Sequence, residues 1–148
     1  MKRTLGLTLL LFATLFSCMR QEKPLPAELS RAESVMWEHP DSALSILRSM
    51  PQSSLSSGKN YATWALLLAQ ARDKVYGKRL PDSLNIPFSD KLVQDAMDYF
   101  EKEGNLKRMA QTYYYKGQLL KDQKKITEAM PFFLKSKEMM TKLDEPLF

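Results

Sequence analysis

The stretch that decides the fold is 110-AQTYYYKGQLLKDQKKITEAMPFFLKSKEMMTKL-143. It contains two runs of helical periodicity on either side of a charged turn near residues 122–125, with no strand-like alternation. In the second run, apolar or small residues recur at helical spacing and predict one inward stripe: Ala129, Phe133, Ser136, Met140 and Leu143. The stretch therefore predicts two antiparallel helices that pack through this stripe.

The same pattern continues through the rest of the chain. We predict helices over residues 26–38, 42–50, 60–76, 89–103, 105–121 and 127–143. His39-Pro40 and Pro51 end the first two helices, and Gly77 and Gly104 are expected just past later helix ends. The predicted N-terminal caps are Asp41 with Ser42, then Asn60, Ser89 and Asn105. The sequence thus predicts an all-α fold of three antiparallel helix pairs.

The N-terminus has the composition of an export signal. Two basic residues at positions 2 and 3 precede residues 5–16, which carry no charge. This run of about 12 residues is shorter than the roughly 20 that a membrane-spanning helix needs, and such a run after a basic start is typical of a secretory signal. The next residues, Leu15-Phe16-Ser17-Cys18, resemble the bacterial lipobox, although Phe16 is bulkier than the usual middle residue. The resemblance implies a signal peptide over residues 1–17 and acyl chains on Cys18.

Cys18 is the only cysteine, so no internal disulfide can form. An unpaired thiol is a liability in an oxidising compartment, and acylation would consume it. Several acyl chains would anchor the protein stably, because each buried CH₂ contributes about 0.8 kcal/mol. We expect residues 18–25 to form a lipidated tether at the cell envelope, in the outer membrane. An ordinary signal peptide with a chance cysteine is the alternative.

The charge of the chain argues against a nucleic-acid partner. The whole chain has a formal net charge of +5, and the predicted signal contains two basic residues and no acidic ones. The mature chain would therefore carry a net charge of +3, which is weak support for binding nucleic acid or anionic lipid. We expect the membrane contact to be made by the N-terminal lipid alone.

Residues 110–143 resemble a tetratricopeptide repeat (TPR), a 34-residue helix–turn–helix unit with the pattern W-x₂-L-G-x₂-Y…A-x₃-F…P. The residues at pattern positions are Tyr113, Gly117 and Leu120 in the first helix, and Ala129 and Phe133 in the second. Lys116 in place of Leu and Thr141 in place of Pro are departures from it. Two weaker copies precede this one, closed by Ala96-x₃-Phe100 and by Ala43-x₃-Leu47. The resemblance implies a TPR-like solenoid over residues 26–143, with units of about 26–57, 60–104 and 105–143.

Four stretches also resemble exported TPR lipoproteins of the Bacteroides type. They are Pro40 to Leu47, Leu55 to Lys59, Ala65 to Lys74 and Tyr113 to Gly117. Members of that group are usually longer, and some continue through a membrane helix to a cytoplasmic regulatory segment. The register agrees, because residues 144–148 would be the start of a further repeat. We therefore expect an uncapped last helix and a chain that forms the N-terminal part of a longer solenoid.

Catalysis has little support in the sequence. The only histidine, His39, is expected at a helix end beside Pro40. One histidine and an acylated cysteine exclude metal clusters and Cys/His nucleophilic pairs, and no nucleophile elbow, P-loop or dinucleotide-binding motif is present. The carboxylates of Asp95, Asp98, Glu101 and Glu103 are expected on solvated helix faces. We expect no enzymatic activity, no metal and no cofactor.

The TPR resemblance also implies which residues line a binding surface. Tyr113 would lie in the core of the repeat, whereas Tyr114 would face the concave side. The same side would carry Arg72, Gln111, Gln118 and Lys121. Arg72 and Lys121 have the chemistry to hold a peptide carboxylate, and ordinary solvated charges are the alternative.

These observations predict a lipid-anchored, non-catalytic scaffold of the bacterial cell envelope that binds a protein or peptide partner. An extended or helical peptide would lie along the concave face. Two other functions stay open at this stage. One is a glycan-binding outer-membrane lipoprotein, and the other is the periplasmic sensor half of a signalling regulator.

Overall fold

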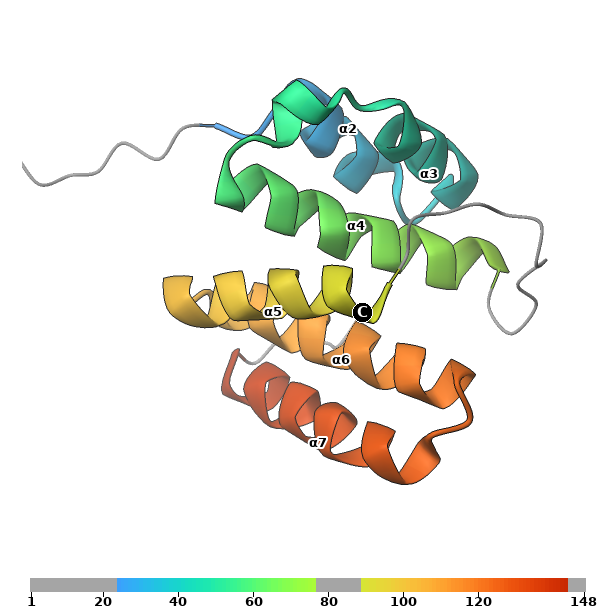
Figure 1. The fold of residues 1–148 in the computed structure, drawn as a ribbon, viewed down its shortest axis with the longest axis vertical. Coiled ribbons are helices and arrows are strands. Elements are labelled where there is room, and N and C mark those ends of the chain that lie inside the picture. The colour runs from blue at the N-terminus through green and yellow to red at the C-terminus, as the bar shows by residue number, and fades with distance from the viewer. Residues whose placement is uncertain (1–23, 77–88, 144–148) are drawn as a thin grey trace, which may run out of the picture.

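The structure is a computed structural model that describes residues 24–76 and 89–143 (Figure 1). This part of the chain contains six α-helices, one short 3₁₀ helix and no strand. The elements are α2 (Ala27–Val35), α3 (Pro40–Ser49), η2 (Gln52–Leu55), α4 (Gly58–Tyr76), α5 (Asp90–Glu103), α6 (Leu106–Asp122) and α7 (Ile126–Leu143). The predicted signal peptide, Cys18, Gly77 and the predicted start of a further repeat at 144–148 lie outside the described residues.

Successive helices pack in antiparallel pairs, α2 with α3, α4 with α5 and α6 with α7 (Figure 1). The pairs are joined in chain order, because α3 also packs on α4 and α5 also packs on α6. The first helices of the pairs touch as well, since α4 contacts both α2 and α6. The prediction of an all-α fold built from sequential antiparallel helix pairs is confirmed.

Two of the predicted helix caps are confirmed. The Ser89 Oγ accepts from the Leu92 N–H at 3.3 Å at the start of α5. The Asn105 Oδ1 accepts from the Arg108 N–H at 3.1 Å at the start of α6. Gly104 ends α5 with a φ of 72°, the left-handed conformation that favours glycine. Local backbone chemistry therefore places the α5–α6 connection where the sequence indicated.

The caps predicted for α3 and α4 are wrong. Helix α3 begins at Pro40, with His39 in the capping position, because proline at the first helical position loses no hydrogen bond. Helix α4 begins at Gly58, and the Ser57 Oγ accepts from the Asn60 N–H at 3.1 Å. Asn60 lies inside the first turn, where its side-chain Nδ2 donates to the Ser54 carbonyl at 2.9 Å. Its amide thus fixes the preceding loop instead of capping α4.

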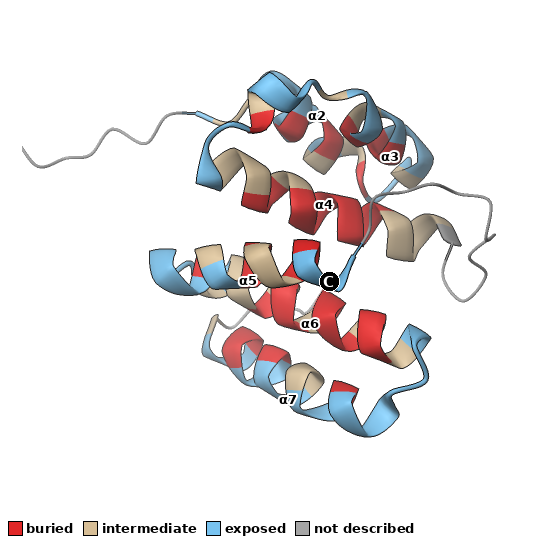
Figure 2. Ribbon diagram, viewed as in Figure 1, coloured by how far each residue is buried: buried red, intermediate tan, exposed pale blue. Residues whose placement is uncertain are grey.

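The core runs through all six helices (Figure 2). Helix α4 is apolar on several sides because it lies between neighbours, and Leu66, Leu67 and Leu68 are each at most 2% exposed. A second apolar cluster joins α5, α6 and α7 through Met97, Ala110, Tyr113, Met139 and Met140. None of the helices in residues 24–76 and 89–143 combines the length and apolar character of a membrane span.

The third pair packs through the predicted inward stripe of α7. Ala129, Ser136 and Met140 are buried, whereas Phe133 and Leu143 are half-buried. The Ser136 Oγ donates to the Ala110 carbonyl at 2.7 Å, which satisfies its hydroxyl inside the helix interface. The predicted inward stripe of α7 is therefore confirmed.

Candidate functional site

Polar side chains from α4 and α6 meet around Gln118, in the C-terminal halves of both helices. The Gln118 Nε2 donates to Asp73 Oδ1 and to Tyr114 Oη, both at 3.2 Å. The Gln118 Oε1 accepts from Lys121 Nζ at 2.6 Å. An ion pair between α4 and α6 accompanies these bonds, with Arg72 Nη1 3.6 Å from Asp122 Oδ2. We call this set the Gln118 cluster: Arg72, Asp73, Tyr114, Gln118, Lys121 and Asp122.

Partial burial shifts the pKa values of three side chains in the Gln118 cluster. Desolvation raises the pKa of the Asp73 carboxyl above its ordinary value, against the opposing effects of the Gln118 hydrogen bond and nearby cations. Desolvation also lowers the pKa of Arg72 and raises that of the Tyr114 hydroxyl. Arg72 and Tyr114 make further interactions besides those in the cluster. With two cationic and two acidic side chains, the cluster is a sheltered set of donors and acceptors with balanced formal charge.

A second polar group lies toward the N-terminal end of α6. The Arg108 Nη2 is 2.8 Å and 2.9 Å from the two carboxylate oxygens of Glu33 in α2. The Arg108 Nη1 also donates to Gln111 Oε1 at 3.4 Å. We call Glu33, Arg108 and Gln111 the Arg108 cluster. Glu33 lies in α2 and Arg108 in α6, so this ion pair links the first and third helix pairs. Helix α4 lies between them and packs against both α2 and α6.

Both clusters lie on one side of α6. The polar side chains of that helix, Arg108, Gln111, Tyr114, Gln118 and Lys121, follow one another at intervals of three or four residues. We call the two clusters together the polar face. The first helices of the three pairs, α2, α4 and α6, all contribute to it. A partner lying along this face would therefore touch every helix pair.

The structure brings together four of the five residues predicted to bind a ligand. Arg72, Tyr114, Gln118 and Lys121 belong to the Gln118 cluster, whereas Gln111 belongs to the Arg108 cluster. Four members of the polar face were missed: Glu33, Asp73, Arg108 and Asp122. The helical spacing of Arg108 before Gln111 was a usable signal for Arg108. No sequence pattern indicated that Glu33 lies opposite it.

The aromatic rings of α6 pack against other side chains of the protein, so they do not form an open platform on which a ligand could stack. Tyr113 is buried, as predicted, and Tyr115 is buried as well. Tyr114 lies edge-on to Tyr115 and to Phe133, with ring centroids 5.2 Å and 5.7 Å apart. Tyr114 therefore offers mainly its hydroxyl to the polar face. Trp37 is a large exposed aromatic, at 56%, and the Lys74 Nζ lies 3.2 Å from its ring centroid. This contact is a cation–π pair between α4 and the turn after α2.

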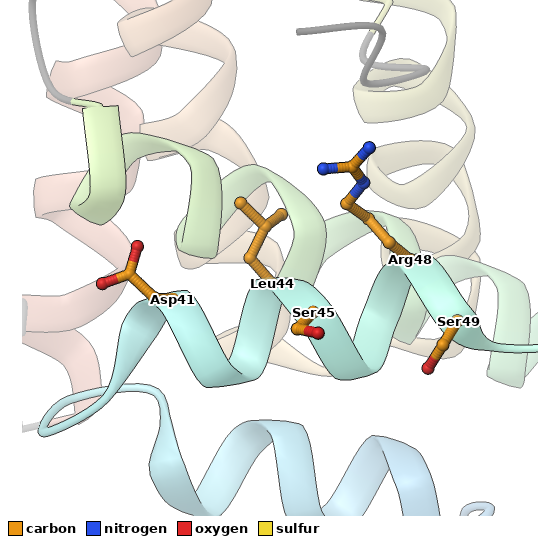
Figure 3. A pocket seen from close by; sticks show the side chains of 5 residues that line it. All are labelled: Asp41, Leu44, Ser45, Arg48 and Ser49. Carbon is orange, nitrogen blue, oxygen red and sulfur yellow. The ribbon is translucent and has the colours of Figure 1, made fainter.

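An open hollow of about 470 Å³ lies beside α3 (Figure 3). Its described lining comes from one helix: Asp41, Leu44, Ser45, Arg48 and Ser49. Asp41, Leu44 and Arg48 project from the side of α3 away from α2, while Ser49 points elsewhere (Figure 3). In a binding pocket, polar groups from several elements surround the ligand, whereas the described residues that line this hollow all belong to α3. The polar face is therefore the stronger candidate.

Other polar contacts have structural roles. Lys116, which departs from the repeat pattern, is 6% exposed, and its Nζ lies 2.6 Å from Asp90 Oδ1 at the start of α5. The Tyr113 hydroxyl donates to the Glu101 carboxylate and accepts from Lys135 Nζ. Within residues 24–76 and 89–143, no three carboxylate, histidine or cysteine side chains gather in a metal-binding arrangement. The contacts of Lys116 and Tyr113 join neighbouring helices, so the polar face stays the candidate binding surface.

Comparison of the chain with protein-family models, with curated proteins and with solved structures finds no match and identifies no family.

Proposed function

We propose that this chain is a TPR-like solenoid, held at the bacterial cell envelope by lipid on Cys18, that binds a partner protein without catalysing a reaction. The polar face is the proposed binding surface. The single observation that carries the proposal is the Gln118 cluster, which holds amide, ammonium and hydroxyl groups in fixed positions on two packed helices.

The packing of the helices supports the solenoid part of the proposal. In the first two pairs the second helix packs on the first helix of the following pair, and α4 touches the first helices on both sides. The three alanines at corresponding places, Ala43, Ala96 and Ala129, are each at most 1% exposed. Small residues at these places allow close helix packing, and repetition of one unit is what builds a solenoid.

The chemistry of the polar face supports a peptide as ligand. A peptide backbone supplies N–H and C=O groups in alternation, and the Gln118 cluster contains both acceptors, such as Asp73, and donors, such as Lys121. The bound segment would replace bonds that the cluster now makes within itself. Balanced formal charge favours a partner recognised by hydrogen bonds over one held by net charge.

The proposed location rests on the sequence. The basic start, the short apolar run and Leu15-Phe16-Ser17-Cys18 support export and acylation, with the outer membrane as the expected site. The unpaired state of the only cysteine agrees with this assignment. Lipid on Cys18 would place the helical domain beside the membrane on a tether of a few residues.

Cross-linking in intact envelopes, followed by purification of the full chain, tests the proposal. We expect a partner protein to be recovered with the wild type and to be lost with Gln118→Ala. Gln94→Ala is the matched control, because Gln94 on α5 also donates its amide to an aspartate, Asp98, at 2.8 Å but lies away from the polar face. Equal recovery with both variants, or no partner with the wild type, would contradict the proposal.

Glycan binding is the second candidate function, and Trp37 favours it. An exposed indole ring offers a flat surface on which a sugar can stack, and Trp37 is 56% exposed. A bound sugar would use the ring face opposite Lys74, or displace that ammonium from the ring. Quenching of tryptophan fluorescence by saccharides, present in the wild type and lost in Trp37→Phe, would support this function. Unchanged quenching in Trp37→Phe would show that the saccharide binds at another site.

A further inference from the structure

Helix α7 has an apolar stripe that no described helix covers. Ile126, Met130 and Leu134 are 54%, 52% and 61% exposed. They follow one another at intervals of four residues, so their side chains lie along one side of the helix. The side of α7 away from α6 is largely exposed (Figure 2). We call these three residues the α7 stripe.

The positions that correspond to Met130 in the earlier pairs are buried. When Ala43, Ala96 and Ala129 are aligned, Met130 corresponds to Leu44 and to Met97, which are 4% and 6% exposed. Met97 is covered by residues of the following pair, α6 and α7, and Leu44 is part of the core cluster that includes the buried side of α4. At both earlier places, therefore, a following helix covers the side chain that α7 leaves exposed.

A second correspondence leads to the same conclusion. Ile126 aligns with Val93 of α5, which is 2% exposed, whereas Ile126 is 54% exposed. Leu134 aligns with Glu101, whose carboxylate accepts a hydrogen bond from Tyr113 of α6. The α7 stripe thus occupies the side that α5 uses to contact the next helix. Its shape and spacing suit another helix better than an extended strand.

The charges around the α7 stripe specify the partner further. Residues 124–142 contain five lysines and two glutamates: Lys124, Lys125, Lys135, Lys137, Lys142, Glu128 and Glu138. Lys142 pairs with Glu138, and Lys135 bonds to Tyr113 of α6. The other charged residues of this segment, Lys124, Lys125, Lys137 and Glu128, still carry an excess of positive charge. Two copies of α7 placed against each other would bring two sets of excess positive charge together. Charge complementarity therefore favours an acidic partner over a second copy of this chain.

We propose that the α7 stripe is a docking surface for an amphipathic helix of a partner protein with acidic residues beside its apolar side. The partner helix would cover Met130 as α6 and α7 cover Met97. Its carboxylates would meet Lys137, three residues after Leu134, and Lys124 and Lys125, which precede α7. This surface is separate from the polar face, since no residue of α7 belongs to either polar cluster.

Binding of a synthetic helical peptide to the purified full chain tests the proposal by fluorescence anisotropy. The probe has one leucine stripe flanked by glutamates, and a second peptide has lysine at every glutamate position. We expect the acidic peptide to bind at least tenfold more tightly than the basic one, with weaker binding as salt is raised. Leu134→Glu should weaken binding of the acidic peptide by tenfold or more, because it removes apolar contact and adds like charge.

Ser30→Glu is the control, since it adds the same charge at an exposed position of α2. This variant should bind the acidic peptide as the wild type does. Equal affinity for the two peptides, no binding of the acidic one, or no effect of Leu134→Glu would overturn the proposal. Analytical ultracentrifugation of the protein alone tests whether a second copy of this chain covers the α7 stripe. A wild-type dimer that becomes a monomer in the Leu134→Glu variant would assign the stripe to a second copy and likewise overturn the proposal.

Discussion

Gly117 of α6 lies directly against the ring of Phe133 in α7. A Cβ added to Gly117 would lie 2.7 Å from Phe133 Cε1 and 2.8 Å from Cδ1, closer than carbon atoms can approach. The ring is itself held edge-on by Tyr114, with centroids 5.7 Å apart. The pair therefore fixes how closely α6 and α7 approach.

Gly117→Ala should destabilise the fold despite the better helix propensity of alanine. The propensity gain is about 1 kcal/mol, while overpacking of a well-filled interface costs about 1–3 kcal/mol. We expect a lower melting temperature by calorimetry or circular dichroism. The double variant Gly117→Ala/Phe133→Leu should recover part of the loss, because contacting residues are not additive. A higher melting temperature for Gly117→Ala alone would show that Phe133 moves aside freely.

Cys18→Ala should abolish fatty-acid labelling of the chain. The expectation rests on Leu15-Phe16-Ser17-Cys18 and on the absence of any other cysteine. The unlabelled protein should be released from membranes or retain its signal, since the short apolar run is a weak anchor by itself. Ser17→Ala is the matched control, because it keeps a small residue before the cysteine and should be labelled like the wild type. Equal labelling of Cys18→Ala would place the lipid elsewhere or exclude it.

Most of the helical fold could be predicted because the buried residues of each helix recur at helical spacing in its own sequence. The stripe Ala129, Phe133, Ser136 and Met140 indicated its buried side without knowledge of any neighbour. The start of α4 was predicted wrongly, since Ser57 and Asn60 are both good capping residues three positions apart. Local signals therefore gave the helices but left some ends ambiguous.

The polar face could be predicted only in part. The TPR resemblance and helical spacing put Tyr114, Gln118 and Lys121 on one side of α6. Which carboxylates lie opposite depends on how α2, α4 and α6 pack, and periodicity within one helix does not contain that information. Glu33 and Arg108 are 75 residues apart in the chain and meet only in the folded protein.

The ion pair between Glu33 and Arg108 should contribute a small, salt-sensitive coupling to stability. Its side chains are 42% and 17% exposed, so solvent screens the attraction between them. A double-mutant cycle with Glu33→Gln and Arg108→Gln should give a coupling of about 0.2–1 kcal/mol, lowered as salt is raised. The pair Glu138 and Lys142, 65% and 61% exposed, is the control and should couple no more strongly. A zero coupling at low salt would mean that this contact does not stabilise the packing of the three pairs.

The Asp73 carboxyl should make stability depend on pH in an identifiable direction. Desolvation raises its pKa in the folded protein above the ordinary value of 3.8. The folded state therefore binds more protons than the unfolded state above pH 3.8, and the contribution of Asp73 to stability falls as the pH rises through its folded pKa. Asp73→Asn removes this dependence and keeps an acceptor for the Gln118 amide. We expect the stability of Asp73→Asn, relative to the wild type, to increase between pH 3.8 and neutral pH in denaturant titrations.

Asp98→Asn controls for the exchange of a carboxylate for an amide, because Asp98 also accepts from a glutamine, Gln94, at 2.8 Å but lies exposed on α5. The sign of the Asp73 effect decides between two descriptions of the Gln118 cluster. If the relative stability of Asp73→Asn instead decreased as the pH rose, the attraction of Arg72 and Lys121 would outweigh desolvation. The cluster would then be a solvated set of ion pairs, and a peptide would have to compete with charges already well paired.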